Sequence, residues 1–186
     1  MKGFLAVLFF SILSVNADTY GDWEYTVENG VATLTKYTGS GGVINIPSVL
    51  GETPVNKIAG GIFSTWVEMD DWWSNNTAVT SVTIDPGIVV IDSWAFFQCI
   101  NLVSITIPPS VTSIGTGAFF QCGKLARVNF EGNAPSSVGP HAFYDTPATI
   151  YILENTVGWY NPFAGRPTNQ DWEYTVINGE ARITRY

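Results

Sequence analysis

Side chains that commonly carry enzymatic chemistry are scarce in this sequence of 186 residues. It contains one histidine, His141, and two cysteines, Cys99 and Cys122. These three cannot form a zinc site of normal ligand spacing, because structural zinc takes four closely grouped ligands. The sequence has no G-x-S-x-G or H-E-x-x-H pattern, and no glycine-rich phosphate loop opens a helix. We therefore predict neither enzymatic activity nor a cofactor.

Three acidic residues, Glu68, Asp70 and Asp71, lie close enough in sequence to suggest a calcium site or a glycosidase. The calcium loop of an EF-hand requires a central glycine and a terminal glutamate, and both are missing here. A retaining glycosidase needs two carboxylates about 5 Å apart on rigid supports, which one loop does not provide. Solvated charge is the simpler interpretation, and a hydrolase is kept only as a remote alternative.

Three of the seven tryptophans, Trp66, Trp72 and Trp73, fall within residues 64–77, which we interpret as a tryptophan-rich insertion into the first repeat. Two interpretations are open for them. The indoles can fold back over the apolar core, because tryptophan normally buries most of its area. Alternatively, they project as a platform for a sugar face or a partner side chain, as aromatic hot spots do. Trp94 would extend that platform if it faced the same edge.

A repeat of 23 residues must position these side chains. Val82, Ile105 and Val128 occupy one repeat position, and the same spacing relates Ala95 to Ala118. Other equivalent pairs are Ile91 and Ile114, Phe96 and Phe119, and Cys99 and Cys122. A fixed period in this range is typical of a solenoid, in which stacked units bury a shared core. His141 falls where Trp94 and Gly117 stand in neighbouring copies, so we interpret it as a solvated side chain.

Within each repeat, alternating apolar residues predict one short strand. Leu102, Ile105 and Ile107 follow the L-x-x-L-x-L spacing of leucine-rich repeats, and Pro108 should end the strand. Residues 118–120 are expected to form a helical or 3₁₀ turn. We thus predict a right-handed leucine-rich-repeat solenoid, mainly β with short helical turns. Phe96 and Phe119 should be buried in it.

The segment NLVSITIPPSVTSIGTGAFFQC resembles the BspA-like leucine-rich repeats, with I-x-I-P, V-x-x-I-G, A-F and a cysteine in register. The resemblance covers about residues 43–152 and is strongest over 78–130. It implies a secreted or cell-surface protein of bacteria, or of some parasitic protists, used for adhesion and protein binding. It also implies a ladder of buried, unpaired cysteines.

For Cys99 and Cys122 the residues themselves leave two states open. One rung of a sheet separates neighbouring strands by about 4.8 Å, and a disulfide accepts Cα separations of about 4.4–6.8 Å. However, both thiols should point inward in parallel, which is a poor direction for a bridge. An extracellular address favours oxidation, so free and bridged states both remain possible.

The outward positions of the strands form two columns of mostly polar side chains. They are Val43, Ser81, Ser104, Arg127 and Thr149 in one column, and Asn45, Thr83, Thr106, Asn129 and Tyr151 in the other. Threonine suits an exposed strand for reasons of propensity alone, but such a sheet is also the usual binding face of a solenoid. The candidate binding surface comprises Trp66, Trp72, Trp73, Trp94, Ser81, Thr83, Ser104, Thr106, Arg127, Asn129 and Tyr151.

The flanks of the repeats complete the domain organisation. Residues 1–17 have the charged, apolar and small-residue regions of a signal peptide, so no membrane span is expected after its cleavage. Residues 18–42 contain Asn29-Gly30 between alternating strands and predict a β-hairpin that caps the solenoid of residues 43–168. Residues 169–186 hold a second hairpin copy, identical at 11 of 16 positions. It indicates either a truncated tandem module or a reused cap.

A net charge of −8 argues against nucleic acid as a partner. We therefore expect a secreted or cell-surface, non-catalytic module that binds an extracellular protein or surface glycan. Its expected role is adhesion. The alternative is a structural spacer within a larger envelope protein. The two differ in whether the repeats themselves contact a ligand.

Overall fold

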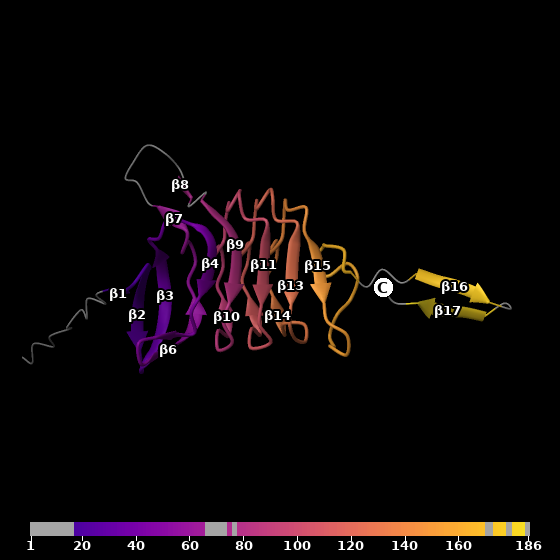
Figure 1. Cartoon of the computed structure of the whole chain (residues 1–186), viewed down its shortest axis with the longest axis horizontal. Helices are drawn as coiled ribbons and strands as arrows, with labels where there is room; N and C mark the ends of the chain where they lie inside the picture. Colours follow the sequence, from indigo (N-terminus) through magenta and orange to yellow (C-terminus); the bar gives the residue numbers. More distant parts are fainter. Residues whose placement is uncertain (1–16, 66–73, 76–77, 170–172, 178–179, 185–186) are drawn as a thin grey trace, which may run out of the picture.

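The repeats stack their main strands into one parallel sheet. The computed structural model describes residues 17–65, 74–75, 78–169, 173–177 and 180–184, so most of the expected signal peptide lies outside it. The strands are β4 (Gly42–Ile46), β9 (Val79–Ile84), β11 (Ser104–Ile107), β13 (Arg127–Phe130) and β15 (Thr149–Ile152). They follow one another across the sheet in this order (Figure 1). Ser104 pairs with Ser81 on one side and Arg127 on the other, which confirms the 23-residue register.

A second sheet runs along another side of the stack. It contains β6 (Thr53–Ile58), β10 (Val90–Ile91), β12 (Ser113–Ile114) and β14 (Ser137–Val138), all paired in parallel. The short β5 (Val49–Leu50) pairs antiparallel with β6. Each repeat thus passes once through each sheet, and the apolar side chains of both sheets meet between them. The predicted solenoid is confirmed.

The N-terminal hairpin joins the second sheet at its edge. Strand β2 (Trp23–Glu28) pairs antiparallel with β1 (Asp18–Tyr20) and with β3 (Val31–Tyr37), and β3 then pairs in parallel with β6. Asn29 and Gly30 both have positive φ, as a tight hairpin turn requires. Trp23 packs on Tyr37, whose ring lies 5.6 Å from that of Phe63. The hairpin therefore extends a sheet and also covers the first core ring.

A ladder of phenylalanines forms the centre of the core. Phe63, Phe96, Phe119 and Phe143 follow one another with ring centroids 5.0 Å apart at each step. The last three are 0% exposed, so the expected burial of Phe96 and Phe119 is confirmed. The rings of Phe96, Phe119 and Phe143 are nearly parallel, with interplanar angles of 8° and 1°. Identical side chains in one register stack in this way because each repeat contacts only its neighbours.

The segments expected to form helical turns contain isolated hydrogen-bonded turns, and the described residues include no helix. Phe120 N, for example, donates to Gly117 O. Residues in the left-handed backbone region stand at both ends of each turn: Trp94 and Gln98, Gly117 and Gln121, and His141 and Asp145. A left-handed residue ends a right-handed helix. The three residues between two of them are too few to form one.

Both cysteines are buried free thiols. The Cys122 thiol donates to Phe96 O at 3.0 Å. Burial raises the pKa of Cys122 to about 12, and burial with the neighbouring Cys122 raises the pKa of Cys99 well above its usual range. The thiolate is the reactive form of cysteine, so these side chains behave as small apolar groups.

We expect neither thiol to react with Ellman's reagent at pH 8 while the protein is folded, because both are buried and protonated. In guanidinium without reductant, two thiols per chain should react. Rapid labelling of the native protein would contradict the buried state. The absence of reactive thiols after unfolding would indicate a disulfide instead.

The C-terminal end of the main sheet is covered by an irregular segment. Ile150 N donates to Pro167 O, and Asn169 N donates back to Ile150 O, so residues 167–169 run along the free edge of β15. The ring of Phe163, which is 2% exposed, contacts those of Trp159 and Phe130 at the end of the core. This segment satisfies the backbone groups that a terminal strand would otherwise leave exposed.

Two further strand pairs lie outside the solenoid turns. Strands β7 (Ser64–Thr65) and β8 (Ser74–Asn75) pair antiparallel and join the two ends of the tryptophan-rich insertion. Strands β16 (Glu173–Ile177) and β17 (Glu180–Thr184) form the second hairpin. Among the residues that the structure describes, no helix is long and apolar enough to cross a membrane.

Candidate functional site

The outward face of the main parallel sheet carries most of the candidate residues. On each strand the apolar side chains point into the core and the alternate side chains point out. The burial pattern of β11 and β15 alternates accordingly. Ser81, Thr83, Ser104, Thr106, Arg127, Asn129 and Tyr151 all lie on this face, partly or fully exposed.

Hydrogen bonds between rungs order this face along the solenoid. The hydroxyl oxygens of Ser81 and Ser104 lie 2.9 Å apart. Asn129 Nδ2 donates to Thr106 Oγ1 at 3.4 Å. These contacts link equivalent positions of successive repeats, so the side chains hold fixed orientations before any ligand arrives. A preorganised surface loses less conformational entropy on binding.

A depression of about 400 Å³ lies at the C-terminal half of this face. Four predicted residues line it together: Thr106, Arg127, Asn129 and Tyr151. The Arg127 guanidinium carbon lies 3.8 Å from the centroid of the Tyr151 ring, a cation–π contact. The contact places the guanidinium over the Tyr151 ring.

Two further polar residues line this depression, and neither was predicted as a site residue. Glu131 follows β13 directly, and its carboxylate adds an acceptor to the depression. Asn169 enters from the covering segment, where its side-chain oxygen accepts from Ile152 N at 2.9 Å. Glu131 could have been found as the polar residue after the strand. Asn169 lies beyond the repeats, and no spacing signal points to it.

Trp94 lies at another part of the molecule, in the turn after β10. Its indole is 40% exposed and covers Gly117, where an added Cβ would meet the ring at 2.4 Å. Its ring centroid lies 5.6 Å from that of Phe97 and 5.7 Å from that of Phe120. Trp94 therefore belongs to an aromatic cluster at the turns and not to the sheet face.

The other three tryptophans of the candidate surface, Trp66, Trp72 and Trp73, lie outside the described residues, as do Glu68, Asp70 and Asp71. Within the described ranges, no group of three or more His, Cys, Asp and Glu side chains could hold a metal ion. The sheet face instead offers hydrogen-bond donors, acceptors and one aromatic ring, which suit binding by contact.

The comparison with known families agrees with this architecture. Residues 70–160 match a family model described as "BspA type Leucine rich repeat region (6 copies)". The predicted resemblance to BspA-type repeats is confirmed over this range, which is just under half of the chain. No curated protein matches the chain. The BspA-type repeats account for the 23-residue spacing, while the paired ends of the 64–77 insertion and the 24-residue step from Ser113 to Ser137 are departures from it.

Solved structures show the same fold. A leucine rich cell surface protein from Faecalibacterium prausnitzii A2-165 is 27% identical, with a TM-score of 0.58. The match covers 76% of this chain and 38% of that one, so this chain spans well under half of that protein's length. The leucine rich repeat protein of T. pallidum is 20% identical over 73% of this chain and 71% of its own, with a TM-score of 0.51.

Proposed function

We propose that this protein is a non-catalytic binding module that acts outside the cell, at the cell surface or after secretion. It contacts an extracellular protein or a surface glycan through the outward face of its main sheet. The observation that supports this most is the depression in which Arg127, Asn129, Glu131 and Tyr151 converge. The match of residues 70–160 to the BspA-type repeat model and the likeness to a protein described as cell-surface support the location.

The chemistry of the depression favours contact with a polar, uncharged or mixed-charge surface. Arg127 and Glu131 contribute opposite charges, and Asn129 supplies both a donor and an acceptor. Tyr151 adds an amphipathic ring, and arginine and tyrosine are enriched among residues that dominate binding energy. The regular hydrogen-bonded rows of β9 and β11 extend this contact area along the solenoid.

The test is binding of the purified chain to a printed glycan array and to immobilised collagen, fibronectin and laminin. For any ligand that binds, Arg127→Ala and Tyr151→Ala should each weaken binding at least tenfold, because truncating a hot-spot side chain typically costs about 2 kcal/mol or more. The melting temperature should change little, since both side chains lie on the surface.

Lys124→Ala is the matched control, because it removes an exposed positive charge that bonds to Asn101 Oδ1 away from the depression. It should bind as the parent does. Equal losses for Lys124→Ala and Arg127→Ala would indicate a nonspecific charge effect. A ligand that binds all three variants unchanged would exclude this face as its site. Binding to none of the glycans and proteins tested would favour the spacer alternative.

A further inference from the structure

A second ladder of aromatic rings lies on the outside of the turns. Phe97, Phe120 and Tyr144 follow one another with centroids 5.8 and 5.1 Å apart, one rung at a time. Tyr144 is stacked on Phe120 with an interplanar angle of 20° and is 53% exposed. No ring among the described residues continues the ladder past Tyr144. Phe120 stacks on one face of the Tyr144 ring, and the His141 ring contacts Tyr144 with centroids 5.5 Å apart at an interplanar angle of 88°.

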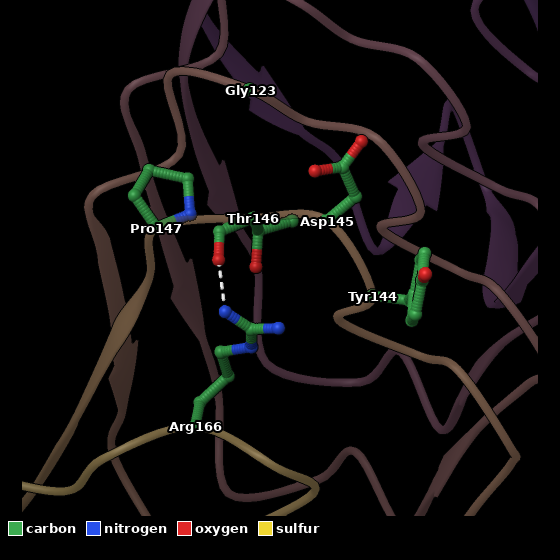
Figure 2. Close-up of a pocket in the computed structure, with 6 residues that line it drawn as sticks. All are labelled: Gly123, Tyr144, Asp145, Thr146, Pro147 and Arg166. Carbon is green, nitrogen blue, oxygen red and sulfur yellow. Dashed lines mark hydrogen bonds between the residues drawn. The ribbon is translucent and has the colours of Figure 1, made fainter.

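A cavity of about 470 Å³ lies at this open end of the ladder. Its lining comes from two neighbouring turns and from the covering segment: Gly123, Tyr144, Asp145, Thr146, Pro147 and Arg166 (Figure 2). Gly123 leaves its side open, because an added Cβ there would meet nothing within 4 Å. The cavity is large enough for a single small ring.

Arg166 is held in place on one wall. Its Nη1 donates to the backbone oxygen of Thr146, and Thr146 is itself buried, with its hydroxyl donating to Phe143 O at 2.9 Å. In Figure 2 the second terminal amino group is directed to the side of Tyr144. The Nε atom is buried without a hydrogen-bond partner. A guanidinium carries five N–H donors, so Arg166 can donate to a ligand from its second terminal amino group, whereas the buried Nε cannot reach one.

Asp145 supplies acceptors on another wall. It is exposed, its φ of 56° lies in the left-handed region, and its carboxylate points toward Gly123 in Figure 2. It forms no ion pair with Arg166. Two opposite charges thus border one cavity without neutralising each other. A ligand that both donates and accepts hydrogen bonds can satisfy both groups at once.

We propose that this cavity binds one pyranose ring of a neutral glycan. The C–H face of the sugar packs on the exposed part of the Tyr144 ring, whose π face is negative. One hydroxyl oxygen accepts from Arg166, and another hydroxyl donates to Asp145. A few placed polar groups around an apolar surface are typical of small-molecule sites. A net charge of −8 and the Asp145 carboxylate disfavour an anion, and Arg166 disfavours a cation.

The test is a titration of the ¹⁵N-labelled chain with the methyl pyranosides of glucose, galactose, mannose and N-acetylglucosamine, followed by NMR. At least one should shift the amide signals of Gly123, Tyr144 and Asp145 with a Kd in the millimolar range. Methyl glucuronide, glycine and lysine test anionic, zwitterionic and cationic occupants. Saturable shifts at these residues with one of them, and none with the neutral sugars, would overturn the proposal.

Variants locate the site and separate it from the sheet face. Tyr144→Ala and Arg166→Met should each weaken sugar binding at least tenfold, while Tyr144→Phe keeps the ring and should bind as the parent does. Gly123→Tyr should block the cavity with no change in melting temperature. Arg127→Ala, which tests the sheet face, should leave the sugar titration unchanged. Full sugar binding by both Tyr144→Ala and Gly123→Tyr, or no shift with any sugar, would refute the assignment.

Discussion

Replacing Phe119 by alanine is expected to lower the free energy of unfolding by about 3–5 kcal/mol, as truncation of core phenylalanines generally does. The ring is 0% exposed and stacks on Phe96 on one side and Phe143 on the other, both at 5.0 Å. Its loss leaves a gap in the middle of the ladder that the rigid rungs cannot close. Urea unfolding followed by tryptophan fluorescence measures the change, which is a large part of the total of about 5–15 kcal/mol for a typical protein.

The adjacent residue provides a matched control. Phe120 has the same chemistry but lies in the outer aromatic ladder, where its side chain is only partly buried. Phe120→Ala should cost less than half as much, because less apolar area returns to water. Equal losses for the two variants would mean that the inner ladder contributes no more than the outer one. The register of the core would then have to be revised.

The second large effect is expected at Gly115, where successive repeats come into close contact. A Cβ at this position would lie 2.2 Å from Ser93 N and 2.6 Å from Asp92 C. Because both atoms are backbone, no side chain can move aside, and the rungs must separate. Overpacking of this kind costs about 1–3 kcal/mol. We expect Gly115→Ala to reach the upper end of that range, measured as the shift in the urea midpoint at constant slope.

Gly123→Ala is the control for Gly115→Ala. Gly123 has open space around it, and neither glycine has a positive φ, so the two substitutions differ in the space available. The change at Gly123 should stay within about 0.5 kcal/mol, as for other surface positions. Similar losses of unfolding free energy at both positions would mean that the effect comes from replacing a flexible glycine and not from steric overlap. The close approach of the rungs would then carry no energetic weight.

The two experiments probe what makes the binding surfaces rigid. The sheet face and the Tyr144 cavity are built on the same rungs. Asn129 directly follows the core residue Val128, and Tyr144 directly follows Phe143. Any variant that loosens the stack should therefore also weaken binding. Binding variants must accordingly be compared at equal folded fraction, which the unfolding curves provide.

The repeat array could be predicted from the sequence because its contacts are one-dimensional. A residue in a solenoid packs on its equivalents in the neighbouring rungs, so the 23-residue spacing of Val82, Ile105 and Val128 specifies their pairing directly. The burial of Phe96 and Phe119 follows from the same spacing. The outward position of Arg127 and Tyr151 follows from the strand period of two.

Only the tertiary structure decided what happens where the period ends. The terminal rung has no next copy, so packing of an irregular segment determines what covers it, and this brings Asn169 beside Tyr151 and Arg166 beside Tyr144. The left-handed residues at the turns, and hence the absence of a helix among the described residues, depend on how each turn packs against the rung before it. Likewise, the sequence predicted the N-terminal hairpin itself, but the parallel pairing of β3 with β6 depends on the free edge that the first rung presents. Sequence periodicity determines contacts between equivalent residues, whereas contacts between non-equivalent residues depend on the three-dimensional shape of the ends.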